Sequence, residues 1–262
     1  SLARRLDQYG DDGVYLDGTT EPFGCTNELH GDGYVGEDGE RHRTYPIFAV
    51  RDLMRRMRHV IKSRKPDGLI SAHMSATVSI PTLAFVDSYW DGEQLDVHEH
   101  GFRLPLDAFR AEFMGHNWGV PAEFLSYLNR PFTYEESVPL ALLHDVPVRP
   151  YARAGDLLGM MTRVWDAWDT IEIEHARWFP YWYGDGPVRA EADDVLVSTH
   201  VGSGGKLVVA MNASAQDREI RLTLGEDAGT VYELIRDRQY TVEGGTVTIA
   251  TPAWEGAVLL VQ

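Results

Sequence analysis

Three short apolar segments in the first part of the chain end in a side chain that can take part in acid–base chemistry. The segment GVYLD ends at Asp17, GLISAH ends at His73, and LAFVD ends at Asp87. The last segment continues as DSYWDGEQ, which adds Asp91 and Glu93. The carboxyl ends of parallel strands meet at one edge of a sheet, where α/β proteins place their reactive groups. We therefore expect Asp17 to face Asp87 or Asp91 across a shared cleft.

Two opposed carboxyl groups beside aromatic rings suit the cleavage of a glycosidic bond. One carboxylate attacks or stabilises the cationic carbon, while the other, held protonated, gives its proton to the departing oxygen. In this interpretation Asp17 is the nucleophile or stabiliser, and Asp91 or Asp87 is the acid/base. Tyr and Trp rings offer apolar faces to the C–H groups of a sugar. The predicted substrate-binding residues are Tyr15, Glu21, His30, His73, Tyr89, Trp90 and Glu93.

Other interpretations of these polar residues compete with the first. An aspartate that ends a strand before Gly-Thr-Thr can simply cap a turn or the next helix. The stretch HGDGYVGEDGE is rich in oxygen donors that suit calcium, but it lacks the spacing of a known calcium loop. A metal-assisted hydrolase could use a set of histidines, namely His30, His73, His98 and His100. We predict that the protein uses no metal and no cofactor.

Hydrophobic periodicity predicts the elements that must position these groups. Strands are predicted over residues 13–17, 68–73, 83–87, 120–127 and 146–150. Amphipathic helices are predicted over residues 46–62, 105–115, 134–144 and 156–176. Strands that alternate with helices in this way are typical of a parallel sheet with right-handed crossovers.

The number of predicted strands limits the architecture. About five parallel strands are too few to close an eight-stranded barrel. If this is a (β/α) TIM-barrel-type domain, the chain carries only its later half, and a missing segment or a second chain supplies the early strands. An open sheet is the plainer alternative. Further along, short alternating runs between Gly, Asp and Asn predict an antiparallel β-sandwich of about seven or eight strands. The predicted domains are residues 1–184 and 185–262.

The composition excludes several kinds of partner. A formal net charge of −16 lacks the cationic footprint that nucleic-acid binding requires. No apolar run reaches the ~18 residues that span a bilayer, and we expect no signal peptide in this chain. The single cysteine, Cys25, leaves no intrachain disulfide and no cysteine-based zinc site. Because the chain opens at Ser1 within an amphipathic stretch, we expect a processed, truncated or split product, and a secreted or periplasmic location is favoured.

Several stretches resemble a known family of carbohydrate-active proteins. They are YLDGT, HGDGY, RTYPIFAVRDLMRRM, FVDSYWDGEQ and MGHNWGVPAEFL. Together they are similar to bacterial proteins of the glycoside hydrolase family 123-like type, in the segment known as the amino-terminal domain, over residues 12–180. This resemblance implies a barrel glycosidase fold followed by a β-sandwich, and a carbohydrate substrate.

The resemblance also bears on mechanism. Characterised family members act on N-acetylgalactosaminides with help from the substrate's acetamido group, through an adjacent Asp-Glu pair, whereas Gly-Thr-Thr separates Asp17 from Glu21 here. A looser likeness links the chain to the retaining α-galactosidases of glycosidase clan D, which use one Asp after barrel strand four and another after strand six. By that analogy Asp17 is the nucleophile, and Asp87 or Asp91 the acid/base. The alternative function is a non-catalytic carbohydrate-binding protein or a subunit of a split glycosidase.

Overall fold

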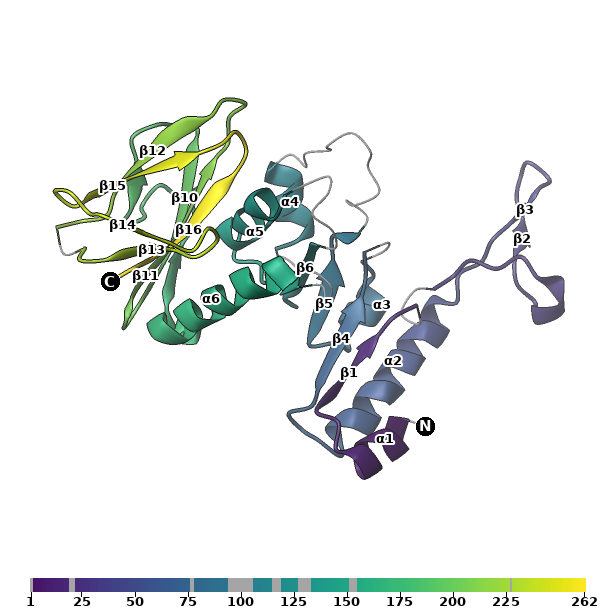
Figure 1. The fold of residues 1–262 in the computed structure, drawn as a ribbon. Helices are drawn as coiled ribbons and strands as arrows, with labels where there is room; N and C mark the ends of the chain where they lie inside the picture. The colour runs from purple at the N-terminus through teal and green to yellow at the C-terminus, as the bar shows by residue number, and fades with distance from the viewer. Residues whose placement is uncertain are drawn as a thin grey trace. The chain divides into compact units, whose positions relative to one another are not determined.

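A computed structural model describes residues 2–18, 22–75, 78–93, 106–114, 119–126, 133–150, 155–226 and 228–262. The chain forms two compact units (Figure 1): Ser1–Asp91 with Gly115–Glu123, and Gly92–Met114 with Phe124–Gln262. The domain boundary at 184/185, where the character of the sequence changes, stays a prediction. None of the helices among the described residues is both long and apolar enough to cross a membrane.

The α/β part of the chain is built on a parallel sheet. The strand order is β1-β4-β5-β6-β7, with bounds β1 Gly13–Leu16, β4 Leu69–His73, β5 Ser88–Asp91, β6 Ala122–Ser126 and β7 Val148–Pro150. Pairing is parallel between β1 and β4, between β4 and β5, and between β6 and β7. Four of the five predicted strands therefore form where the sequence places them.

Helices of the first unit pack beside β1, β4 and β5. They are α1 (Leu2–Tyr9), α2 (Ile47–Lys62) and α3 (Ile80–Leu83). The predicted apolar stripe of α2 buries Val50, Met54 and Ile61, because residues three, four and seven apart share one face of a helix.

The strand predicted at 83–87 is wrong. Ser79, with extended backbone, and a proline in the first turn start the short helix α3 there, and the strand β5 begins only at Ser88. The backbone N–H of Asp87 donates to Ile70 O at 2.8 Å. Asp87 therefore stands at the amino-terminal end of β5, and Asp91 at its carboxyl end.

Residues 22–45, which we call the arm, leave the sheet between β1 and α2. The arm contains the 3-10 turn η1 (Glu28–His30) and a small hairpin of β2 (Tyr34–Val35) and β3 (Arg41–His42). Its two ends are joined by an isolated antiparallel bridge between Cys25 and Thr44. Figure 1 shows the arm reaching away from β1 and α2.

The second unit holds the longer C-terminal part of the chain. Its helices are α4 (Leu106–Glu112), α5 (Tyr134–Leu143), α6 (Gly155–Ile171) and the turn η4 (Ile173–His175). The helix α5 begins at a capping box in which Thr133 and Glu136 satisfy each other's backbone N–H groups. His144, directly after α5, is fully buried, and burial lowers its pKa to about 4.

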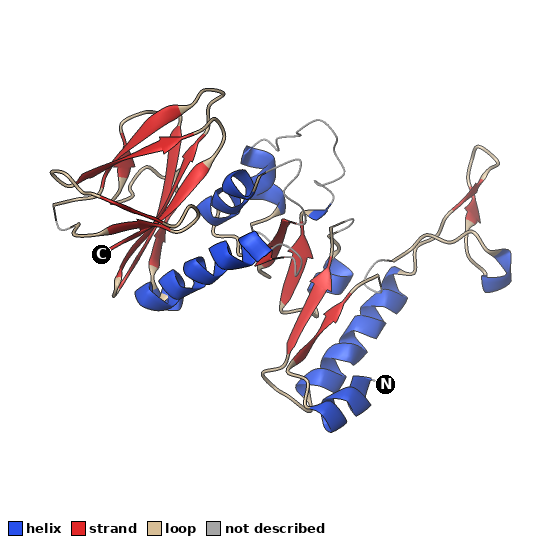
Figure 2. Cartoon of the chain, in the orientation of Figure 1, coloured by secondary structure: helices blue, strands red, loops and turns tan. Residues whose placement is uncertain are grey.

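The C-terminal strands form two antiparallel sheets (Figure 2), with orders β14-β13-β16-β11-β10-β8 and β15-β12-β9. Their bounds are β8 Arg177–Phe179, β9 Arg189–Ala190, β10 Val195–Gly202, β11 Gly205–Asn212, β12 Arg218–Thr223, β13 Val231–Glu233, β14 Arg238–Tyr240, β15 Thr246–Thr251 and β16 Gly256–Val261. Inward-facing side chains of both sheets, among them Val208, Ile220 and Leu259, form one buried cluster. The predicted fold class, a partial (β/α) barrel followed by an antiparallel sandwich, is confirmed.

Candidate functional site

The carboxyl ends of β1, β4 and β5 lie level with one another in the first unit. Leu16 is in register with Ala72, and His73 is in register with Trp90. Asp17, which follows β1 directly, therefore stands at the same edge of the sheet as His73 and Trp90. This is the edge at which parallel α/β proteins gather their reactive groups.

Side chains of three strands meet on one face of this edge. The ring of Tyr15 is stacked on that of Trp90, with centroids 4.1 Å apart and planes at 29°. The Tyr15 hydroxyl lies 2.6 Å from Nδ1 of His73. Because side chains alternate between the two faces of a strand, Asp17 shares this face with Tyr15. The four residues form the strand-end cluster: Tyr15, Asp17, His73 and Trp90.

His73 links the polar groups of the strand-end cluster. Its Nδ1 is 3.7 Å from Oδ1 of Asp17, and its Nε2 is 2.9 Å from Oγ of Ser75. The imidazole side chain is only 15% exposed, whereas the Asp17 side chain is 70% exposed. The Asp17 carboxylate is thus open to solvent and lies near an imidazole that Tyr15 and Ser75 hold in place, so it can meet a ligand at this edge.

Two predicted site residues of β5 are buried instead. Tyr89 and Asp91 are both 0% exposed, and alternation along the strand directs both to the face opposite Trp90. The Tyr89 ring is in register with Ala72, which is also fully buried, so it occupies a core position. Gly92, with a φ of 116°, turns the chain directly after Asp91. The pairing of Asp17 with Asp91 stays a prediction.

Asp87 is held by basic side chains of α2 at the other end of β5. Its carboxylate accepts from Arg58 at 3.1 Å and from the Ile70 N–H at 3.0 Å, and it pairs with Lys62 at 2.9 Å. Burial raises the pKa of the Asp87 carboxyl, but these donors outweigh burial and set the pKa below its ordinary value. The expectation that Asp87 ends a strand and faces Asp17 is corrected, because the strand begins after it.

The roles of the remaining predicted residues stay predictions. His30 lies in η1 of the arm and is exposed, and Glu93, which is half-buried, belongs to the second compact unit. Their contact with a substrate stays a prediction. Glu21, His98 and His100 lie outside the described residues.

Sequence reasoning missed two features of the molecule. Ser75 contacts His73 across one intervening residue, and the spacing His-x-Ser after a strand could have drawn attention to it. Within the described part of the chain, a possible metal-ligand group of three residues lies in the arm: Cys25, His30 and Asp32. The cysteine and histidine are five residues apart in sequence, which is a spacing that could have signalled it.

Residues 160–234 match the model of the family "Glycoside hydrolase 123, C-terminal domain". The expected resemblance to this family is thus confirmed for this segment, which covers most of α6 and the first strands of the sandwich. The resemblance expected from the motifs lies instead on residues 12–180. No curated protein is significantly similar to the chain in sequence.

Solved structures of glycosidases are similar in fold. A GH27 β-L-arabinopyranosidase from Geobacillus stearothermophilus aligns with a TM-score of 0.51 at 12% identity, over 99% of this chain and 60% of its own. A noncanonic maltogenic α-amylase from Thermotoga neapolitana aligns with a TM-score of 0.51 at 10% identity, over 100% and 64%. α-Galactosidase I from Mortierella vinacea aligns with a TM-score of 0.52 at 11% identity, over 99% and 70%. The chain therefore spans less than two thirds of the arabinopyranosidase and of the amylase.

Proposed function

We propose that this chain, which carries a match to the glycoside hydrolase 123 C-terminal domain, is the larger part of a glycoside hydrolase. The observation that carries the proposal is the strand-end cluster, in which an exposed carboxylate, an imidazole and two stacked aromatic rings share one face. The substrate is a poly- or oligosaccharide, because this combination suits a sugar better than it suits a charged or wholly apolar ligand.

Asp17 is the proposed nucleophile or stabiliser. Its carboxylate is open to solvent, so it can approach the anomeric carbon of a bound sugar, where positive charge develops in the transition state. His73 lies 3.7 Å from this carboxylate, and the hydroxyl of Tyr15 holds the imidazole at 2.6 Å. Attack by the carboxylate would form a bond to the anomeric carbon while the bond to the leaving oxygen breaks.

The stacked pair of Tyr15 and Trp90 is the proposed platform for the sugar. Tyr15 is 41% exposed, so part of its ring remains available beside the Asp17 carboxylate. Aromatic faces pack well against the C–H groups of a pyranose, and a ring that is already stacked loses little conformational entropy when a ligand binds. The platform therefore orients the sugar, and Asp17 carries the chemistry.

Asp91 is the proposed acid/base. It ends β5, which lies two strands from β1, and Gly92, with a φ of 116°, turns the chain directly after it. In the structure the Asp91 carboxyl is fully buried on the face opposite Trp90, so the role requires a conformational change at the end of β5, and the assignment is testable apart from that of Asp17. Asp91→Asn should lower turnover of substrates with poor leaving groups far more than turnover of activated aryl glycosides, which need little protonation.

The early barrel strands are proposed to come from a segment outside this chain or from a second chain. Among the described residues β1 pairs only with β4, which leaves its other edge open. An open groove of ≈ 920 Å³ runs along that edge, lined by α1, β1 and Met57. A further parallel strand with its helix would fit beside these elements.

A second candidate function is carbohydrate binding without catalysis. The open edge of β1 favours this candidate, since an incomplete barrel can still bind a glycan on the aromatic platform. Glycan binding by the whole protein without release of reducing sugar supports this candidate, and release of sugar excludes it.

The test compares Asp17→Asn with Asp12→Asn at the two ends of β1. The whole protein, with any chain that copurifies, is assayed on aryl glycosides and oligosaccharides. Asp17→Asn should lower turnover by on the order of 10³-fold, with an unchanged melting temperature. Asp12 pairs with Lys65 on the surface and its side chain is fully exposed, so its variant should keep full activity. Full activity of Asp17→Asn overturns the assignment.

A further inference from the structure

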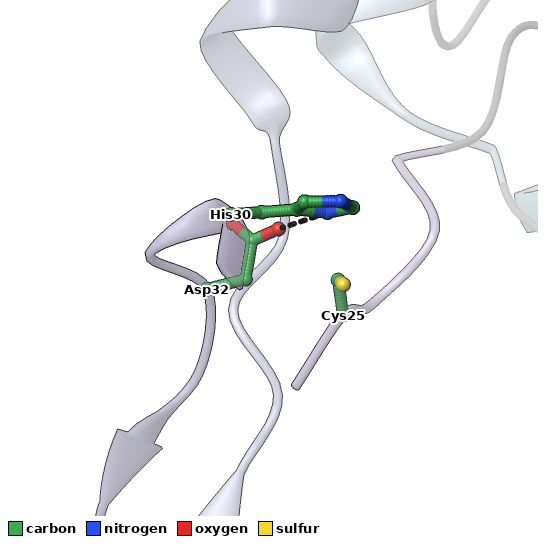
Figure 3. Close-up of side chains that lie close together, drawn as sticks. All are labelled: Cys25, His30 and Asp32. Carbon is green, nitrogen blue, oxygen red and sulfur yellow. Dashed lines mark ion pairs between the residues drawn. The ribbon is translucent and has the colours of Figure 1, made fainter. Parts of the chain in front are cut away.

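Three metal-ligating side chains converge in the arm. Cys25, His30 and Asp32 each offer one ligand atom, and these atoms all lie within 4.8 Å of one another. Figure 3 shows the three side chains close together, and the imidazole of His30 is 3.7 Å from the Asp32 carboxylate. The group belongs to the first unit, stands apart from the strand-end cluster in sequence, and has no role in the proposed hydrolysis.

The backbone around this group is held by its own hydrogen bonds. Cys25 exchanges two backbone bonds with Thr44, at 2.9 and 3.0 Å. The side chain of Asn27 accepts from Leu29 N–H at 3.0 Å and so starts η1. Gly31, with a φ of 76°, closes the turn, and only a residue that tolerates the left-handed region fits there without strain. The three ligand positions are therefore set by the chain itself.

Contrary to the expectation from the single cysteine, we propose that Cys25, His30 and Asp32 bind a zinc-class divalent cation. Sulfur, imidazole nitrogen and carboxylate oxygen are all zinc ligands, at about 2.3, 2.0 and 2.1 Å, and water can fill the fourth position of the tetrahedron. Ligand atoms of such a site lie roughly 3.3–3.8 Å apart, so the group must contract by about 1 Å. His30, whose side chain is 65% exposed, is free to make most of that movement.

The chemistry of the group selects among cations. A thiolate is a soft ligand that calcium and magnesium avoid, since both prefer oxygen. The thiolate of Cys25 and the carboxylate of Asp32 together balance the charge of a divalent ion. Arg41, a cation of the same arm, is bound to Glu28 at 3.0 Å and to the carbonyl oxygens of Thr26 and Asp32, so its charge is partly neutralised.

A bound cation would stabilise the folded conformation of the arm. It would join residue 25 to residue 32 and, through the Cys25–Thr44 bridge, tie η1 to the chain that leads into α2. Arg41 and Arg43 lie in this part of the arm and are sites for trypsin. Cleavage there should therefore slow when the cation binds, whatever the activity of the protein.

The experiment titrates the whole metal-free protein with Zn²⁺ alone against a chromophoric chelator, and with Co²⁺ as a spectroscopic probe. We expect one equivalent of Zn²⁺, a cobalt spectrum with a sulfur-to-metal band, and slower tryptic cleavage in the arm. Cys25→Ser should abolish the sulfur band, and His30→Gln and Asp32→Asn should each weaken zinc binding at least tenfold.

His42→Gln is the matched control. His42 lies in the same arm and pairs with Asp38 at 2.9 Å, but it is not part of the metal-ligand group found among the described residues, so its variant should bind Zn²⁺ as the parent does. The proposal is overturned if the wild-type protein shows no sulfur band with Co²⁺, if Cys25→Ser binds Zn²⁺ unchanged, or if His42→Gln weakens binding as much as His30→Gln.

Discussion

The hydroxyl of Tyr15 and Nδ1 of His73 lie 2.6 Å apart, although the two residues are 58 positions apart in sequence. This contact joins the ends of the adjacent strands β1 and β4. The same imidazole nitrogen is 3.7 Å from the Asp17 carboxylate. The geometry therefore makes His73 the centre of the strand-end cluster, and the properties of Asp17 depend on how firmly that imidazole is held.

Tyr15→Phe removes this hydrogen bond and keeps the ring stacked on Trp90. We expect turnover to fall about tenfold, because His73 is held less firmly beside Asp17, and the free energy of unfolding to fall by about 1 kcal/mol. The measurements are kcat and a urea unfolding curve. Tyr9→Phe is the control, since Tyr9 is 69% exposed on α1. Unchanged kcat in Tyr15→Phe would show that the hydroxyl does not support the site.

Trp90→Leu removes one of the two stacked rings of the proposed sugar platform. We expect KM, or the Kd for an oligosaccharide, to rise about tenfold, with kcat reduced less, because the lost contact is made to the ground state as well as the transition state. Isothermal titration with oligosaccharides measures the change in affinity. Trp165→Leu, which replaces a ring that is 37% exposed on α6, should leave affinity unchanged. Equal loss in both variants contradicts the platform.

Asp87→Asn tests the corrected position of this residue. The variant weakens the bonds from Arg58 and Lys62 and should lower the free energy of unfolding by about 1–2 kcal/mol. This value is kept small because Asp87 and its partners are partly exposed to solvent. Because the folded-state pKa of Asp87 lies below 3.8, the carboxylate stabilises the fold above that value and less as pH falls. The difference between variant and parent should therefore shrink in acid. Loss of kcat at full stability would instead place Asp87 in the site.

His144 gives the fold a pH dependence of its own. Its pKa is lowered from 6.5 to about 4 by burial, and the nearby charge of Arg110 adds to this. Between pH 6.5 and about pH 4 the unfolded chain binds a proton at His144 that the folded chain does not. The free energy of unfolding therefore falls as the pH drops through this range, by up to about 3 kcal/mol. Denaturant curves from pH 7 to pH 4 measure it.

His144→Gln should lose this part of the pH dependence, although it destabilises the fold at neutral pH. His175→Gln, at an exposed position in η4, should keep it. An identical pH profile in His144→Gln and the parent would contradict the role of burial.

The sequence predicts most of the fold because its periodicity is strong. GVYLD and GLISAH form β1 and β4 at nearly the predicted bounds, so the placing of Tyr15, Asp17 and His73 at one edge could be predicted. LAFVD is different, since its composition suits a strand, yet the preceding Ser-Ile-Pro starts a helix. Local apolar composition cannot distinguish a strand from a short helix. Predicting a strand over residues 83–87 therefore placed Asp87 at the carboxyl end of a strand, whereas it precedes β5.

Part of the site depends on long-range packing that a single sequence does not reveal. Alternation in SYWD could have shown that Trp90 and Asp91 point to opposite faces, but which face is open depends on the neighbouring strands. The convergence of Cys25, His30 and Asp32 depends on the turn at Gly31 and on the bridge to Thr44. A long loop rich in glycine gives no periodic signal from which that turn could be predicted.

The most direct test is to find which carboxylate lies beside a bound sugar. A sugar-derived epoxide alkylates a carboxylate at its binding site, and peptide mapping by mass spectrometry identifies the ester. We predict an ester on Asp17, formed in step with loss of activity, prevented by excess oligosaccharide and absent from Asp12. Inactivation with the ester on another carboxylate, and none on Asp17, would contradict this prediction.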